Sequence, residues 1–217
     1  MRPGLPRAAE IALSFAGLAI ASPLILAAGA GVVLTSGFPV FFRQKRVGRG
    51  GRPFTLIKLR SMRRSGAGPR VTARGDGRVT PFGRFLRRSK LDELPELWNV
   101  LRGEMSFVGP RPEVAEYVDA SNPLWARVLL ARPGLTDPMT LQLRDEEVLM
   151  ASVEGDREAY YRDVLQPLKL RGYCDYLDRR SWRSDLQVIL ETVLAVLLQR
   201  RSAALEAVES PKPRSGP

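Results

Sequence analysis

The chain has 217 residues, of which 34 are Lys or Arg and 23 are Asp or Glu, so its net charge is +11. This length fits one compact domain with appendages, and the excess charge predicts an anionic partner such as nucleic acid, anionic lipid or a nucleotide phosphate. The chain contains no histidine, which excludes His general bases, Ser-His-Asp triads and zinc sites with His ligands. The single cysteine, Cys174, excludes an intramolecular disulfide and suits a reducing compartment.

An uncharged apolar run extends from Ile11 to Phe42. It is too long for the apolar region of a usual signal peptide. As one straight helix it would be about 48 Å long, against a bilayer hydrocarbon core of about 30 Å. Ser22-Pro23 lies near its middle, where the proline is expected to kink or break the helix. The Ser22 hydroxyl is a candidate partner for the carbonyl that the proline frees.

Basic residues flank this run on both sides. Arg2 and Arg7 precede it, and five follow it: Arg43, Lys45, Arg46, Arg49 and Arg52. Because basic flanks favour the cytoplasmic side of a membrane, we expect a re-entrant hairpin with both ends on that side. A spanning anchor and a buried helix of a soluble protein are the alternatives.

Positive charge is concentrated between Arg43 and Lys90, which contain 16 Lys or Arg and one acid, Asp76. The simplest interpretation is a strip that contacts anionic lipid headgroups. Residues 53–60 alternate as in a short strand, which places Lys58 and Arg60 on one face, where we expect them to contact substrate. Residues 65–77 are rich in Gly and Arg, which is typical of a mobile loop.

An acid pair, Asp92-Glu93, follows this basic segment. Pro95 predicts the first turn of a helix that ends near Arg102, with Gly103 as its C-terminal stop. An acid pair at such a position is most often a helix cap. Next to many cations, however, the carboxylates should stay ionised, and a carboxylate can attack phosphorus without help from a histidine. Magnesium (Mg2+) is the expected cofactor, with Asp92 and Glu93 as its oxygen ligands.

Four cations are candidates for holding phosphate oxygens: Lys58, Arg88, Arg111 and Arg144. Arg111 is favoured because Pro110 and Pro112 fix the backbone on both sides of it. The alternative roles are a bond from Arg111 to a loop carbonyl and contact of Arg88 with lipid or solvent.

The C-terminal half predicts two helices. One covers Tyr160 to Leu177 with a break near Pro167, and the other covers Asp185 to about Gln199 with Ser184 as its cap. The second is apolar over most of its surface and should lie in the core or along a membrane interface. The fold class expected is α/β, mixed and helix-rich with a small sheet. Its parts are a membrane-associated segment (1–42), a catalytic domain (43–200) and a disordered tail (201–217).

Several motifs, in order, carry a resemblance to a known family: Lys58-Leu59-Arg60-Ser61-Met62, residues 78–87, Leu91-Asp92-Glu93-Leu94-Pro95, residues 105–112, and Arg132-Pro133-Gly134-Leu135-Thr136. Together they closely resemble the bacterial sugar transferase family, the monotopic phosphoglycosyl transferases, in its minimal single-domain form. The resemblance covers nearly the whole chain. One departure is Asp137, where many members carry glycine, which bears on sugar specificity.

The resemblance implies transfer of a sugar phosphate from a UDP-sugar to a membrane polyprenol phosphate, with release of UMP. It implies that Asp92 is the covalent nucleophile and that Glu93 supports Mg2+ binding. It also implies that Pro110, Arg111 and Pro112 contact the nucleotide, and that Ser22-Pro23 breaks a re-entrant helix. The expected location is the bacterial inner membrane, with the catalytic domain facing the cytoplasm.

Two rival functions remain open at this point. A membrane-tethered nucleic-acid-binding protein would use the basic segment 43–90, and a scaffold for glycan assembly would lack catalysis. We expect an enzyme without a nucleic-acid partner. The sugar, the polyprenol, the glycan and the oligomeric state are not indicated by the sequence.

Overall fold

The computed structural model describes residues 2–63, 73 and 75–198. The expected disordered tail, 201–217, lies outside the described residues, as does most of the loop expected at 65–77.

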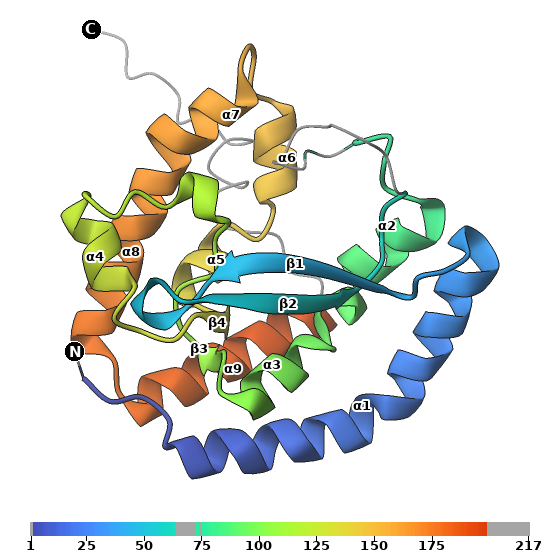
Figure 1. Ribbon diagram of the computed structural model, residues 1–217, viewed down its shortest axis with the longest axis horizontal. Coiled ribbons are helices and arrows are strands. Elements are labelled where there is room, and N and C mark those ends of the chain that lie inside the picture. Colours follow the sequence, from blue (N-terminus) through green and yellow to red (C-terminus); the bar gives the residue numbers. More distant parts are fainter. Residues whose placement is uncertain (1, 64–72, 74, 199–217) are drawn as a thin grey trace, which may run out of the picture.

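Helix α1 (Arg7–Ser36) contains one proline, Pro23, and Figure 1 shows the helix turning sharply partway along its length. A proline removes one backbone donor and is the usual cause of such a kink. The Ser22 Oγ donates a hydrogen bond of 2.8 Å to the carbonyl of Ala19, which lies four residues before Pro23. The expected kink and the expected role of the Ser22 hydroxyl are therefore confirmed.

Among the described residues, α1 is the one helix that is long and apolar enough to cross a membrane. Its first turns are attached to the rest of the chain by polar contacts: Arg7 Nη2 donates to the carbonyl of Leu101 at 2.8 Å, and the buried Glu10 accepts a hydrogen bond from Ser106. Further along, Ala28 and Val32 pack in an apolar cluster with residues 59 and 86.

The strands form two small sheets. Strands β1 (Phe41–Val47) and β2 (Pro53–Leu59) pair antiparallel, with Phe41 opposite Leu59. Strands β3 (Ser106–Val108) and β4 (Gly134–Thr136) pair parallel. With helices making up most of the described chain, this confirms the mixed, helix-rich class with a small sheet.

Short helices connect these strands. Helix α2 (Pro81–Arg88) is capped by the Thr80 side chain, and α3 (Glu96–Arg102) follows Pro95 and ends at Gly103, whose φ is 82°. The α3 boundaries agree with the prediction because proline suits a helix start and glycine a left-handed helix end. The remaining helices and turns are η1 (Arg49–Gly51), η2 (Leu91–Glu93), η3 (Ala115–Tyr117), α4 (Pro123–Val128), α5 (Pro138–Gln142), α6 (Glu146–Ala151), α7 (Arg157–Tyr160), η4 (Tyr161–Leu165), α8 (Gln166–Arg179) and α9 (Trp182–Leu197).

The C-terminal helices differ from prediction in detail. Pro167 lies in the first turn of α8, and the expected break takes the form of a π-helical turn, η4, just before it. The predicted start of the last helix was three residues late. Ser181 caps α9: its Oγ accepts a hydrogen bond from the Ser184 N–H, and the Ser184 Oγ accepts one from the Ser181 N–H. This reciprocal pair is a capping box.

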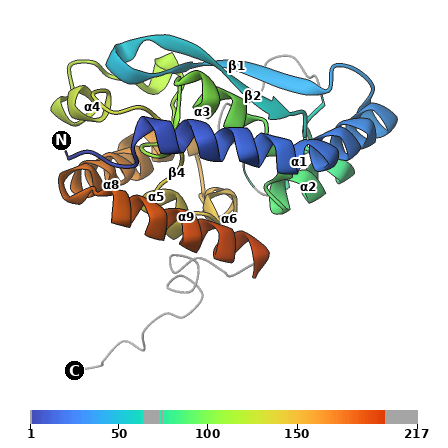
Figure 2. The same ribbon diagram turned by 90° about the horizontal axis from the view of Figure 1, so that it is seen from below.

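The main apolar core lies between α4, α5, α8 and η4, and includes Trp125, Met139 and Tyr173. Figure 2 shows the β1–β2 hairpin on one side of the molecule and α8 and α9 on the other, with α1 running along the face between them. Helix α9 buries only Asp185 and Val188, and it leaves several large apolar side chains exposed, among them Leu186, Leu190, Val193 and Leu197. It is therefore not a core helix.

Candidate active site

The acid pair lies in η2, between α2 and α3. Lys90, just before it, has a φ of 58° and is the one non-glycine residue with positive φ in the part of the chain described. Such a conformation is costly for a lysine and is often found at functional sites. It turns the chain so that Asp92 is buried, with 5% of its surface exposed.

Glu93 is held by two cations. Its Oε1 lies 2.9 Å from Lys58 Nζ and 2.6 Å from Arg111 Nη2. Burial opposes ionisation of Glu93, but Arg111 and Lys58 hold its pKa well below the usual range. Glu93 is therefore a stable anion at neutral pH, and it fixes the positions of both cations.

Glu96 is a third acid in this cluster that the sequence analysis did not single out. Its Oε1 lies 3.0 Å from Lys58 Nζ, although without hydrogen-bond geometry, and its side chain is 2% exposed. Burial raises the pKa of Glu96. Its spacing of three residues from Glu93 at a predicted helix start was an available signal, because residues three apart on a helix share a face.

Asp92 differs from its neighbour. Its Oδ1 is buried and has no hydrogen-bond partner among the described residues. Burial, and then the charge of Glu93, raise the pKa of Asp92. The expectation that nearby cations favour the ionised form agrees with the lowered pKa of Glu93, whereas at Asp92 burial outweighs the nearby cations and the pKa moves in the opposite direction.

The unpartnered Asp92 oxygen suits a hard cation. No group of three or more metal-ligating side chains converges within the described ranges, but Mg2+ commonly binds one or two carboxylates and completes its shell with water and substrate phosphates. Asp92 and Glu93 therefore fit a magnesium ion, and their role as its ligands stays a prediction.

Arg111 is positioned by the loop that follows β3. Gly134 N donates to the carbonyl of Pro110 at 2.9 Å, and Gly109 N donates to the carbonyl of Thr136 at 3.0 Å. A Cβ on Gly109 would lie 2.5 Å from the carbonyl oxygen of Arg132. The close approach of these two segments of the chain therefore requires glycine at position 109. The loop thus brings Arg111 to Glu93, a pairing that the sequence analysis did not predict, and the contact of Arg111 with a phosphate stays a prediction.

The other predicted site residues lie in different surroundings. Arg60 donates to the carbonyls of Ser36 and Phe38 at the end of α1, at 2.6 and 3.0 Å, and it also lines the cavity described below, so its contact with substrate stays a prediction. Arg144 has one nitrogen 3.4 Å from the carbonyl of Ala195 and a buried Nη2 without a hydrogen-bond partner in the described chain. Arg88 lines the same cavity as Arg144, and the roles of both stay predictions.

One cavity of about 2420 Å³ joins these groups. Its lining includes Lys58, Asp92, Glu93 and Arg111, and it extends to Ile20, Ala21 and Leu24 beside the kink of α1 and to the inner face of α9. The cavity therefore combines a charged end with apolar walls supplied by α1 and α9.

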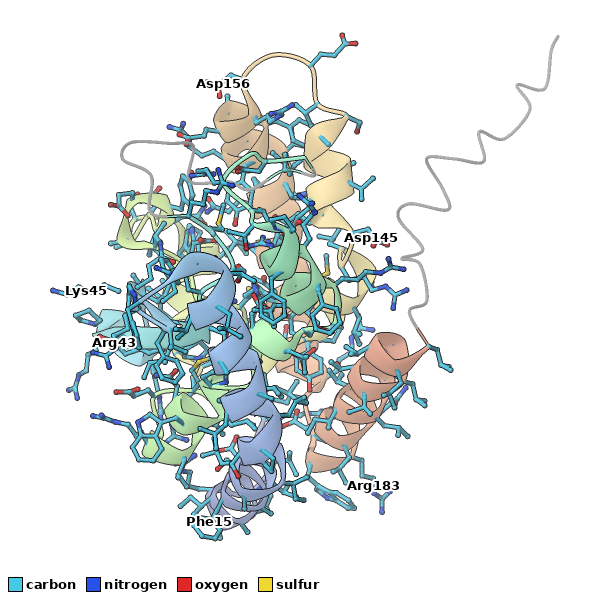
Figure 3. All side chains as sticks on the ribbon, turned by 90° about the vertical axis from the view of Figure 1, so that its right-hand side faces the viewer. Phe15, Arg43, Lys45, Asp145, Asp156 and Arg183 are labelled. Carbon is cyan, nitrogen blue, oxygen red and sulfur yellow. The ribbon has the colours of Figure 1, made fainter. Side chains whose placement is uncertain are left out.

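Figure 3 shows Arg43 and Lys45 on the β1 side, pointing away from the body of the molecule.

Comparison with known proteins agrees with this arrangement. A model of the family described as bacterial sugar transferase matches residues 2–199. The UDP-glucose:undecaprenyl-phosphate glucose-1-phosphate transferase of Caulobacter vibrioides is 39% identical over 212 residues, which cover 91% of this chain and 75% of that protein.

Two further relatives are longer than this chain. The transferase of the same name from Escherichia coli is 41% identical over 196 residues, 87% of this chain and 39% of that protein. The UDP-N-acetylgalactosamine-undecaprenyl-phosphate N-acetylgalactosaminephosphotransferase of Aeromonas hydrophila is 38% identical over 137 residues, 61% of this chain and 32% of that protein. The names of these relatives differ in the sugar and share undecaprenyl phosphate.

Proposed function

Because the chain belongs to the bacterial sugar transferase family, we propose that it moves a sugar phosphate from a UDP-sugar to undecaprenyl phosphate and so initiates assembly of a polysaccharide. The observation that carries this proposal is Asp92 Oδ1, which has no hydrogen-bond partner among the described residues. The neighbouring Glu93 is ionised and already paired with Lys58 and Arg111. The names of the relatives support the two substrates.

The reaction has two steps at one phosphorus atom. An Asp92 oxygen forms a bond to the phosphorus that carries the sugar, and the bond from that phosphorus to the bridging oxygen of UMP breaks, so UMP leaves with the electron pair. A phosphate oxygen of undecaprenyl phosphate then attacks the same phosphorus and displaces Asp92. The product is a lipid diphosphate sugar, and the carboxylate is regenerated.

Cations around Asp92 would stabilise the charge that accumulates on the transferring group. Lys58 and Arg111 pair with Glu93 of the acid pair, and Arg88 and Arg144 line the same cavity. Mg2+ bound by Asp92 and Glu93 would offset the repulsion between the attacking carboxylate and the diphosphate. It would also favour the ionised form of Asp92 against the burial that raises its pKa.

The membrane part of the proposal is a re-entrant α1. The kink at Pro23 and the basic residues on both flanks support a hairpin that enters and leaves on the cytoplasmic side of the inner membrane. The exposed apolar face of α9 supports its lying along the membrane interface. The cavity lining beside the kink would then receive the isoprenoid chain near its phosphate.

Single cysteines test this topology. In a Cys174→Ser background, cysteines placed at Leu5 and at Lys45 should both react with a membrane-impermeant reagent only when the cytoplasmic face is open. Labelling of the two positions from opposite sides would mean that α1 spans the membrane.

A substrate panel tests the reaction. Purified protein in lipid nanodiscs should release UMP from one or a few UDP-sugars, and the sugar phosphate should appear on added undecaprenyl phosphate. Absence of UMP release with every UDP-sugar, from protein with a cooperative unfolding transition, would contradict the proposed function.

A further inference from the structure

A second polar cluster lies directly behind Arg111. It consists of Gln44, Arg46, Glu113 and Tyr161 and is called the Glu113 brace below. Arg46 Nη1 lies 3.2 Å from Glu113 Oε1, its Nη2 donates to Gln44 Oε1 at 2.7 Å, and the Tyr161 hydroxyl donates to Glu113 Oε2. Three segments far apart in sequence, β1, the loop after β3 and η4, therefore meet at one carboxylate.

The brace holds both residues that follow Arg111. Arg46 Nη1 donates to the carbonyl of Pro112 at 3.1 Å, and the backbone N–H of Val47 donates to the carbonyl of Glu113 at 2.8 Å. The backbone before Arg111 is held through Pro110 and Gly109. The backbone is therefore held on both sides of Arg111, which fixes the point from which its side chain reaches Glu93.

Charge is matched pair by pair in this region. Arg46 and Arg111 are close enough to repel each other, and each faces its own carboxylate, Glu113 for Arg46 and Glu93 for Arg111. If Glu113 lost its charge, the uncompensated Arg46 would push Arg111 away from its position or draw Glu93 toward itself. The brace thus acts on Arg111 through electrostatics as well as through backbone contacts.

Tyr161 reaches Glu113 from an unusual backbone. It begins the π-helical turn η4, is 5% exposed, and has Lys169 Nζ 5.2 Å from its ring centroid. A π turn interrupts regular α-helical hydrogen bonding and is frequent at functional sites. Here it coincides with the residue that donates to Glu113.

From this geometry we infer that Arg46, Glu113 and Tyr161 are positioning residues for the transfer reaction, which they support by holding Arg111 against Glu93. The inference rests on the proposed function. Among the described residues no hydrogen bond or ion pair joins the brace to Asp92 or Glu93, so the effect that we infer for Glu113 and Tyr161 reaches the acid pair through Arg111.

A double-mutant cycle separates positioning from a merely structural role. Glu113→Gln and Tyr161→Phe should each lower the kcat for UMP release by about tenfold, as is usual for residues that orient a catalytic group, while KM for the UDP-sugar changes less than twofold. In an Arg111→Gln background the same substitutions should change kcat less than twofold, because the group they position is gone. An equal tenfold loss in both backgrounds would overturn the inference.

The thermal unfolding midpoint serves as the internal reference in this cycle. It should fall by the same amount in both backgrounds, since the hydrogen bonds of the brace are lost in both. Tyr160→Phe is the matched control, because it removes the adjacent tyrosine hydroxyl, for which the described chain shows no hydrogen bond, and it should leave kcat unchanged. If Glu113→Gln does not fold, Tyr161→Phe carries the test with the milder change.

Hydrogen–deuterium exchange tests the brace without any activity. Peptides that cover residues 108–117 should exchange faster in Glu113→Gln and Tyr161→Phe than in the wild type or in Tyr160→Phe. Unchanged exchange in this loop would overturn the inference even if the wild type is active. If the loop exchanges faster in the two variants but the wild type releases no UMP, the result would count against the proposed function and leave the brace supported.

Discussion

Asp92 in η2 and Asp185 in α9 are both nearly inaccessible to solvent, with 5% and 0% of their surfaces exposed, yet their carboxylates are treated in opposite ways. Asp185 accepts hydrogen bonds from Leu5 N, the Tyr176 hydroxyl and two nitrogens of Arg180. Asp92 Oδ1 accepts none from the described residues. The Asp185 carboxylate is therefore hydrogen-bonded on both oxygens within the fold, whereas Asp92 Oδ1 is available to bind a ligand.

This difference indicates which buried acid has chemistry to do. An unsatisfied buried carboxylate costs free energy, so a fold retains one where a ligand completes the site. The Arg180–Asp185 pair joins the N-terminal segment to the start of α9, and Arg180 also donates to the carbonyl of Val108. Burial and charge alone do not separate the two aspartates, but the count of donors does.

The largest expected effect comes from removing the nucleophile. Asp92→Asn should lower UMP release by about 10³-fold or more, because the substitution removes the attacking oxygen. The free energy of unfolding should stay the same or rise, since a buried charge without a partner is lost. Enzyme assays and chemical denaturation measure the two quantities. A large loss of stability would show that Asp92 is a structural residue like Asp185.

Removal of divalent cations should have the next largest effect. Chelation with EDTA is expected to abolish UMP release, and added Mg2+ to restore it, because the dyad alone leaves anions facing a diphosphate. The unfolding midpoint should fall only by the stabilisation that the bound ion supplies, since the Arg180–Asp185 contacts need no metal. Full activity in EDTA would contradict the assignment of Asp92 and Glu93 as metal ligands.

Asp185→Asn should reverse this pattern. It leaves the buried guanidinium of Arg180 without its charged partner, which typically costs about 3–5 kcal/mol of stability. The kcat per folded molecule should stay within about twofold of the wild type. Chemical denaturation measures the loss of stability, and UMP release divided by the concentration of folded protein measures kcat. A loss of kcat at unchanged stability would contradict this prediction.

Asp137 gives the smallest effect and lies between the two cases. It is buried and accepts hydrogen bonds from the backbone N–H and hydroxyl of Thr140, and burial raises its pKa. Since the folded pKa exceeds the unfolded value of about 3.9, the folded state holds the proton more tightly. Stability is then present at low pH and is lost as the pH rises through the folded pKa.

Asp137→Asn should therefore be more stable relative to the wild type at neutral pH than at acidic pH, since asparagine caps a helix about as well. Unfolding free energies of both proteins across this range provide the measurement. A difference that is constant with pH would mean that Asp137 is not held in a proton-retaining environment.

Local features of the chain could be predicted from its sequence. Pro95 and Gly103 bound α3, and Ser22 bonds the carbonyl freed near Pro23, because each depends on residues within one or two helical turns. The ion pairs of Lys58 and Arg111 with Glu93 were not predicted, since the partners lie 35 and 18 residues apart and both cations were assigned to phosphate oxygens.

Other features depend on packing between distant segments and had no sequence signal. Arg60 was expected to share a strand face with Lys58, yet β2 ends at Leu59 and Arg60 donates to the carbonyls at the end of α1, because Leu59 lies opposite Phe41 at the start of β1. The joining of Glu113 to Tyr161 across 48 residues likewise depends on the tertiary fold. The raised pKa of Asp92 follows from its burial, which charge counting along the sequence does not reveal.

The buried Glu10 has a consequence for engineering this protein. Its hydrogen bond from Ser106 joins the first turn of α1 to β3, the strand that leads into the Arg111 loop. A generic hydrophobic segment that replaced the start of α1 would leave Ser106 and the end of α3 without their partners. The first turn of α1, from Arg7 to Glu10, is thus a structural part of the catalytic domain as well as the start of an apolar helix.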